Sequence, residues 1–191
     1  MNMQISICLL TNEQTNVLIM DFSKAFDKIS HSLLMHKLKH HGIHGKVNTC
    51  RIQNFLASRS QAVADEGEMS EYISVESGVS QGSVLGNSLF LFYINDMAVG
   101  IISTVRLFAD KTIAYPTATS EADQLKLQED LNKPPIWEQK WKKMFYPEKR
   151  NVHTISRKIK PIKHEYKLHG HILKSVEIDK YLGCHIAFDL A

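Results

Sequence analysis

The fold is decided by Val17-Leu18-Ile19-Met20-Asp21, a run of four apolar residues that ends in a carboxylate. A short, continuous apolar run is typical of a strand that is buried on both faces. Such a strand delivers Asp21 to its carboxyl end, where the chain enters a loop that can carry functional side chains. Asp21 is therefore the first candidate site residue.

A second acidic position lies about ninety residues further along the chain. The pattern from Thr104 to Tyr115 predicts two strands joined by a turn at Asp110-Lys111. Two acid-tipped strands are what a two-metal nucleotidyl-transfer site requires, because hard divalent ions prefer carboxylate ligands on rigid elements. However, Asp21 and Asp110 are only two of 20 acidic residues, so solvated turn aspartates remain an alternative.

The rest of the chain alternates between helical and extended patterns. Helices are predicted around Leu34 and Leu38 up to Gly42, over 47–56 and over 85–93. A capping box at Ser120 and Asp123 begins another helix, which Pro134-Pro135 must break or kink. A hairpin is predicted for 61–64 and 72–75, a loop for 77–83, and short strands for 152–156, 166–173 and 180–186. This succession predicts an α+β fold with helices packed on a mostly antiparallel sheet.

Composition sets wider limits. A chain of 191 residues that is 43% hydrophobic fits one globular domain, or two small lobes sharing a core. Its net charge of +3 does not demand a nucleic-acid partner, although basic residues crowd between Lys133 and Lys180. Three distant cysteines suggest neither a zinc site nor disulfides, which fits an intracellular, reducing compartment. No apolar run is long enough to span a bilayer, so no membrane partner is expected.

Several segments resemble, in the correct order, the motifs of reverse transcriptases of non-LTR (LINE/jockey-like) retrotransposons. The three palm motifs are Leu18-Ile19-Met20-Asp21-Phe22-Ser23-Lys24-Ala25-Phe26-Asp27, Ser77-Gly78-Val79-Ser80-Gln81-Gly82-Ser83-Val84-Leu85-Gly86 and Arg106-Leu107-Phe108-Ala109-Asp110. Phe145-Tyr146-Pro147-Glu148-Lys149 is similar to the fourth motif, and Tyr181-Leu182-Gly183 to the start of the primer-gripping hairpin. The resemblance covers about residues 14–190, so the chain is interpreted as a partial reverse transcriptase domain over 1–191.

The resemblance implies a palm-like antiparallel sheet and an RNA-directed DNA polymerase that uses Mg²⁺, an RNA template, a DNA primer and deoxynucleotides. Asp21 and Asp110 would then be catalytic metal ligands, with the backbone of Phe22 beside the metal and triphosphate. Lys149 would act near the leaving pyrophosphate as a positive charge or proton donor.

The same resemblance implies a nucleotide pocket. Phe26 would lie under the sugar of the incoming nucleotide and exclude a 2′-hydroxyl. Gln81 and Gly82 would lie against the nascent base pair, the glycine allowing close approach of the backbone. A core phenylalanine and an ordinary loop glycine are the alternatives that the residues alone leave open.

The sequence departs from the family at the third motif, where the family has two adjacent aspartates and this chain has Asp110-Lys111. The degenerate position, Lys111, would replace a metal ligand by a cation, and we expect it to pair with Asp21 or Asp110. Ser80 and Asn87 also stand where the family usually has proline, and Pro134-Pro135 interrupts a regular helix. We further expect the fingers and thumb to be largely missing.

Three hypotheses follow. The first is a decayed polymerase, or pseudoenzyme, that keeps the palm fold but not magnesium binding or DNA synthesis. The second is a weakly active polymerase that relies on Asp21 and Asp110. The third is a non-catalytic nucleic-acid-binding module that uses the basic C-terminal third and the aromatic residues Trp137, Trp141 and Phe145. The four-residue spacing of the two tryptophans favours instead a helix that packs on the palm.

Overall fold

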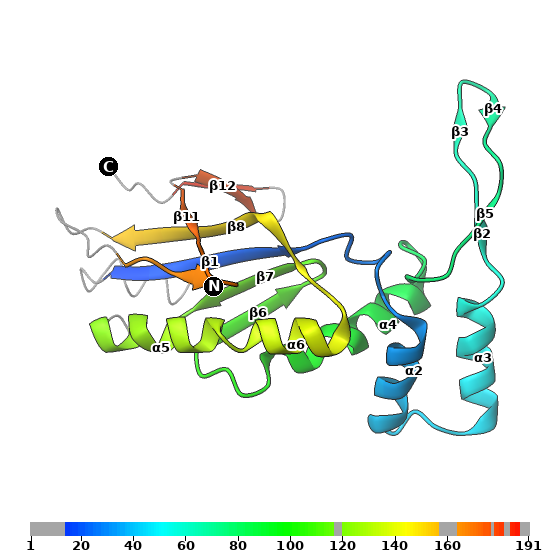
Figure 1. Cartoon of the computed structure of the whole chain (residues 1–191), viewed down its shortest axis with the longest axis horizontal. Helices are drawn as coiled ribbons and strands as arrows, with labels where there is room; N and C mark the ends of the chain where they lie inside the picture. The colour runs from blue at the N-terminus through cyan, green and yellow to red at the C-terminus, as the bar shows by residue number, and fades with distance from the viewer. Residues whose placement is uncertain (1–13, 117–119, 157–163, 177, 182–183, 188–191) are drawn as a thin grey trace. The chain divides into compact units, whose positions relative to one another are not determined.

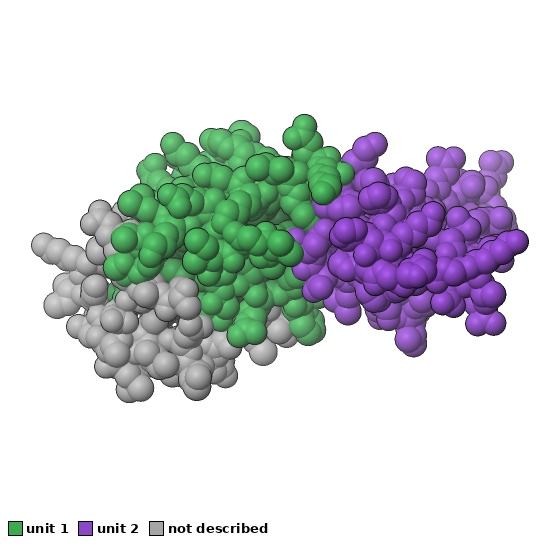
Figure 2. All heavy atoms as spheres, turned by 90° about the horizontal axis from the view of Figure 1, so that it is seen from below, with its two compact units in different colours: residues 1–23, 97–140, 144–191 green, residues 24–96, 141–143 purple. Residues whose placement is uncertain are grey.

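The computed structural model describes residues 14–116, 120–156, 164–176, 178–181 and 184–187. The chain divides into two compact units (Figure 2). The described part of unit 1 lies within residues 14–23, 97–140 and 144–187, and unit 2 consists of Lys24–Asp96 with Trp141–Lys143. Each unit is described by itself.

Unit 1 is built on a five-stranded sheet with the order β11-β8-β1-β7-β6 (Figure 1). The strands are β1 (Gln14–Phe22), β6 (Thr104–Phe108), β7 (Lys111–Tyr115), β8 (Phe145–Ser156) and β11 (Lys174–Ser175). All neighbours are antiparallel except β8 and β11. Every residue of the central strand β1 is buried, which confirms the strand that its apolar run predicts. The sheet and its helices confirm the predicted α+β class.

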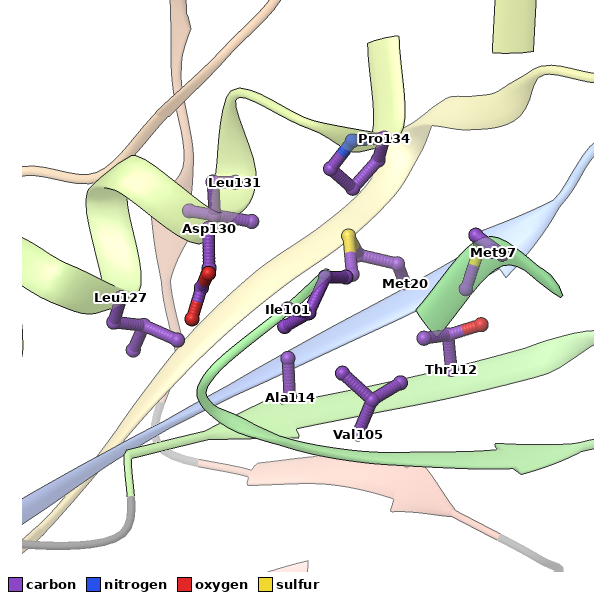
Figure 3. Close-up of a pocket in the computed structure, with 10 residues that line it drawn as sticks. All are labelled: Met20, Met97, Ile101, Val105, Thr112, Ala114, Leu127, Asp130, Leu131 and Pro134. Carbon is purple, nitrogen blue, oxygen red and sulfur yellow. The ribbon is translucent and has the colours of Figure 1, made fainter. Parts of the chain in front are cut away.

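Two helices, α5 (Glu121–Leu131) and α6 (Pro134–Trp141), follow the β6–β7 hairpin. Figure 3 shows Leu127 and Leu131 of α5 beside Met20 of β1 and Ala114 of β7, around a pocket. The space within it is about 10 Å³, room for at most a single water molecule, so it is a packing gap and not a ligand site. Because side chains alternate along a strand, Asp21 points to the face opposite Met20.

Helix α5 begins and ends where the sequence predicts. Ser120 accepts a hydrogen bond from the backbone of Asp123, whose carboxylate accepts one from the Ser120 backbone, so the predicted capping box is confirmed. The helix ends at Leu131, and Pro134 is the first residue of α6. Proline is tolerated there because the first residues of a helix have no intrahelical partner for their backbone N–H groups.

Two of the three strands predicted near the C-terminus are hairpins instead. In place of one strand over 166–173, the structure has β9 (Lys167–Leu168) and β10 (His171–Ile172), joined by a turn in which His169 and Gly170 both have positive φ. In place of a strand over 180–186 it has β12 (Ile178–Tyr181) paired with β13 (Cys184–Ala187). A sequence pattern of alternating side chains continues across a short turn, so it does not show where one strand ends and the next begins.

Unit 2 contains the three predicted helices and the predicted hairpin. The helices are α2 (His31–His40), α3 (Lys46–Leu56) and α4 (Val84–Ile94), the last continuing into a 3₁₀ turn, η1 (Asn95–Ala98). The hairpin consists of β2 (Ser60–Gln61) paired with β5 (Ile73–Ser74) and β3 (Ala64–Asp65) paired with β4 (Glu68–Met69). Among the helices of the described residues, none is long and apolar enough to cross a membrane.

Unit 2 also buries a lysine in its core. Lys37 of α2 is 2% exposed, and its ammonium group pairs with the Asp96 carboxylate at 2.5 Å and donates to the Tyr93 carbonyl. The same group lies 3.9 Å from the centre of the Trp141 ring. A buried cation is tolerated only when it is paired and hydrogen-bonded in this way.

Candidate active site

The two candidate aspartates lie at neighbouring strand ends in unit 1. Asp21 is the second-last residue of β1, and β1 pairs with β7 so that Asp21 stands opposite Lys111. The backbone N–H of Phe22 donates to the carbonyl of Asp110 over 2.9 Å. The end of β1 is thus tied to the tip of the β6–β7 hairpin, and Asp21, Asp110, Lys111 and Lys149 form what we call the carboxylate corner.

The hairpin turn lies one residue earlier than predicted. The sequence pattern predicts a turn at Asp110-Lys111, but the turn is Ala109-Asp110, and Lys111 is the first residue of β7, paired with Phe108. Ala109 has φ of 47°, a left-handed conformation of the kind that tight two-residue hairpins require. The correction matters because it places Lys111 in the sheet and not at the tip of a free loop.

Lys149 reaches Asp21 through an irregularity in β8. The pairing of β1 with β8 shifts register between Met20 and Phe22, whose partners are Arg150 and Phe145. The extra residues of β8 bulge out there, which is how strands commonly redirect side chains near active sites. The Lys149 Nζ lies 3.4 Å from the Asp21 Oδ2, and the Lys149 side chain is 64% exposed.

The charges around Asp21 act in opposite directions. Burial raises the pKa of the Asp21 carboxyl above its ordinary value, and the negative charge of Asp110 raises the pKa further. The positive charges of Lys149 and then Lys111 lower the pKa of Asp21, but they do not cancel the rise. We expected Lys111 to pair with one of the aspartates; the ion pair described for Asp21 is with Lys149.

The residues present do not fit two divalent ions. Magnesium keeps several waters and needs one or two carboxylates, so Asp21 and Asp110 could serve a single ion. Within the described residues, no three His, Cys, Asp or Glu side chains come together to hold a metal. The position that faces Asp21 across the ladder is a lysine, which adds a positive charge where a second ion would need a ligand.

Phe22 is fixed in place by packing. Its ring stacks on Phe145 with centroids 4.3 Å apart and lies 6.0 Å from the Trp137 ring. Phe145 is fully buried, and Trp137 and Trp141 are 9% and 6% exposed. Phe145, Trp137 and Trp141 are therefore core residues, as the four-residue spacing of the two tryptophans favours, and the idea that they offer a stacking surface to bases is wrong.

In unit 2, the structure brings the end of the first motif against the start of the second. The Val79 N–H donates to the Phe26 carbonyl at 2.9 Å, and the Gly78 N–H donates to the Ile29 carbonyl at 2.8 Å. The Ser77 hydroxyl donates to the Asp27 carbonyl at 2.8 Å. We call residues 24–29 together with 77–79 the Gly78 junction. The contacts between its two segments are made by the backbone and one hydroxyl group.

Gly78 is the centre of this junction. It has φ of +84°, and a Cβ atom there would lie 2.7 Å from the backbone of Phe26 and Asp27. Its carbonyl accepts from the Arg59 guanidinium at 2.7 Å and lies 2.7 Å from the His31 Nε2. Sequence analysis missed Arg59 and His31, because neither stands at a motif position and a bond to a distant carbonyl leaves no pattern in sequence.

The residues predicted to form a nucleotide pocket, Phe26, Gln81 and Gly82, belong to the same unit. Phe26 is half-buried and stacks on Phe90 of α4 with ring centroids 4.5 Å apart. Gln81 and Gly82 are exposed, and Gly82 has φ of +87° with open space around it, so it could admit a close neighbour. Gln81 lines a polar cavity of about 660 Å³ together with Lys24, Asp27 and Arg59. In the segment that resembles the start of the primer-gripping hairpin, Tyr181 ends β12, while Leu182 and Gly183 lie outside the described residues.

The chain is similar to known proteins in both sequence and fold. The family model described as reverse transcriptase (RNA-dependent DNA polymerase) matches residues 3–186. The chain is 27% identical over 173 residues to the RNA-directed DNA polymerase from mobile element jockey of Drosophila melanogaster, covering 86% of this chain and 19% of that protein.

A structure of telomerase from Candida albicans in complex with a fragment of telomeric RNA matches with a TM-score of 0.55 and 13% identity. That match covers 99% of this chain and 34% of the telomerase chain, and it supports the palm-like fold alone. The chain thus spans about a fifth and a third of the two proteins. Because the family model covers nearly its whole length, the chain belongs to the reverse transcriptase (RNA-dependent DNA polymerase) family.

Proposed function

We propose that this chain is the reverse transcriptase domain of a non-LTR mobile element, and that it has lost DNA synthesis at the carboxylate corner. The observation that carries the proposal is the register of Lys111, which places a cation directly opposite Asp21. The family's second aspartate would occupy this position by resemblance. The remaining carboxylates are Asp21 and Asp110, and the first of these is already paired with Lys149.

The size of the electrostatic change is large enough to abolish activity. At an effective dielectric constant of about 20, two unit charges 4 Å apart interact by roughly 4 kcal/mol. Replacing a carboxylate by an ammonium group turns an attraction for a divalent ion into a repulsion of similar size. Since each 1.36 kcal/mol corresponds to about tenfold in rate, the expected loss is at least a thousandfold.

The ancestral reaction assigns roles to the other residues. An RNA template, a DNA primer and a deoxynucleotide would be the substrates, and bound Mg²⁺ would polarise the phosphate and activate the primer hydroxyl. Asp21 and Asp110 would hold the ion, with the backbone of Phe22 beside it. Lys149 would neutralise the leaving pyrophosphate. Phe26, Gln81 and Gly82 would receive the nucleotide.

The test is primer extension on poly(rA)/oligo(dT) with magnesium or manganese. The unaltered chain is compared with Lys111→Asp and with the double variant Lys111→Asp, Asp21→Asn. We expect no extension from the unaltered chain, extension from Lys111→Asp, and none from the double variant, which controls for contaminating polymerases.

Two outcomes would contradict the proposal. Extension by the unaltered chain that Asp21→Asn abolishes would show that two carboxylates suffice and that the enzyme is weakly active. If Lys111→Asp stays inactive although magnesium raises its melting temperature, the loss of activity lies elsewhere in the domain. Magnesium should raise the melting temperature of the unaltered chain less than that of Lys111→Asp, which has one carboxylate more.

A further inference from the structure

A second buried lysine in unit 2 has no part in the reaction proposed above. Lys143 follows α6 in sequence, and its side chain is completely buried, with 0% exposed. Its Nζ donates to the carbonyl of Lys24 at 2.9 Å and to the carbonyl of Ala25 at 2.7 Å. Both carbonyls immediately precede Phe26.

The turn at Lys24 and Ala25, which Lys143 contacts, has an unfavourable backbone conformation. Lys24 has φ of 45°, in the left-handed region that residues with a side chain adopt at a cost. The Lys24 carbonyl also accepts from the N–H groups of Asp27 and Lys28, at 3.2 Å each. Lys143 adds a charged donor to this carbonyl and to the next, so it stabilises the turn where the backbone alone is strained.

The two sides of Phe26 are therefore held by different groups. On the N-terminal side, the ammonium group of Lys143 fixes the carbonyls of Lys24 and Ala25. On the C-terminal side, the Val79 N–H fixes the carbonyl of Phe26 itself. The Phe26 ring stacks on Phe90. The position of the ring depends on both sets of hydrogen bonds, because a rotation of the turn about either end would move the ring.

We propose that Lys143 is a positioning residue that sets where the Phe26 ring lies and, through that ring, the preference for deoxynucleotides over ribonucleotides. The second part rests on the proposed function, in which Phe26 lies under the nucleotide sugar. Packing alone does not explain a lysine here, because burying an ammonium group lowers stability unless its N–H groups donate hydrogen bonds. Methionine would fill a similar volume without that cost.

The positioning role is tested by hydrogen–deuterium exchange in Lys143→Met, which removes the donor and keeps the chain length. The control is Lys142→Met, one residue away and exposed. We expect amide exchange over residues 24–29 and 77–79 to accelerate roughly tenfold or more in Lys143→Met, because hydrogen bonds to a charged group are lost, and to stay unchanged in Lys142→Met. Equal exchange in the two variants would overturn the proposal.

A direct measurement covers the case in which Lys143→Met fails to fold. In the unaltered protein, NMR should detect scalar couplings across the hydrogen bonds from the Lys143 Nζ to the carbonyl carbons of Lys24 and Ala25. Absence of these couplings, with a rapidly exchanging Lys143 ammonium group, would contradict the grip itself.

Sugar selection is measured in the Lys111→Asp background as the ratio of dTTP to UTP incorporation. Adding Lys143→Met should lower this ratio roughly tenfold, since a small displacement of a positioning group is costly, whereas Lys142→Met should leave it unchanged. An unchanged ratio in an active enzyme would overturn the selectivity claim. If Lys111→Asp is inactive, the proposed function fails, while the exchange and coupling measurements still decide whether Lys143 positions the turn.

Discussion

The carboxylate corner of unit 1 and the Gly78 junction of unit 2 carry neighbouring motifs of one family, yet they are held in different ways. The corner depends on the charges of four side chains, Asp21 and the three charged groups around it. In the junction, the two motifs meet through backbone hydrogen bonds and at a glycine with no room for a side chain. Lys111, where the chain departs from the family motif, is paired with Asp21 in the sheet. Under the proposed function, the fold therefore outlasts the reaction that it once supported.

The largest effect that tests this comparison is expected from Gly78→Ala. The new methyl group would meet the backbone of Phe26 and Asp27 at 2.7 Å, and the residue would have to keep φ near +84°. A left-handed conformation and a steric clash each cost up to about 3 kcal/mol. We expect the free energy of unfolding to fall by about 3 kcal/mol or more, measured by urea denaturation.

Gly82→Ala is the matched control. Gly82 has a similar φ of +87°, but its Cβ would meet nothing within 4 Å. Only the conformational cost remains, so we expect a loss of about 1 kcal/mol. Equal losses in the two variants would mean that the close approach at Gly78 does not hold the junction, and the contrast between the two regions would disappear.

The sequence could predict the helices and strands of both regions because their apolar periodicity and capping residues are local. It predicted the strand that ends at Asp21, the capping box at Ser120 and the helix break at Pro134. It placed the Asp110 turn one residue late, because a two-residue turn through Ala109 depends on a left-handed conformation that alanine does not signal.

The sequence could not predict the buried contacts of charged side chains. Lys37 and Lys143 are among the most buried side chains, although lysine is rarely buried. The groups that they contact are carbonyl groups, aromatic rings and one aspartate. Each of these groups is far along the chain from the lysine that contacts it. Such partners exist only after the chain has folded, so no local pattern contains them.

An intermediate effect on the free energy of unfolding is expected from Asp130→Asn, which tests a second buried carboxylate of unit 1. Asp130 is buried like Asp21, and burial alone would raise its pKa. Hydrogen bonds from Lys133, Ser103 and Ile102 outweigh burial and lower the pKa of Asp130 below its ordinary value. Since the ionised form is stabilised by folding, we expect Asp130→Asn to lose about 2 kcal/mol at pH 7.

The two carboxylates should make the free energy of unfolding depend on pH in opposite ways. The stabilisation from Asp130 is present above the ordinary aspartate pKa of about 3.9 and is lost as the pH falls through the lower pKa of the folded state. Asp21 behaves oppositely, because its pKa is raised. Its ionised form costs stability at neutral pH, so Asp21→Asn should stabilise the metal-free protein. Urea denaturation between pH 3 and pH 7 checks both, and a loss from Asp21→Asn at pH 7 would contradict this account.

The smallest effect is expected from Lys149→Met at the carboxylate corner. The Lys149 side chain is 64% exposed and lies 3.4 Å from Asp21, and exposed ion pairs contribute about 0.5 kcal/mol or less. The free energy of unfolding should therefore barely change, while the pKa of Asp21 should rise because a lowering charge is removed. Carbon-13 NMR titration of the Asp21 carboxyl measures that rise. If Lys149→Met instead lost as much stability as Gly78→Ala, the corner would be a structural element like the junction, and a change of charge there could not leave the fold intact.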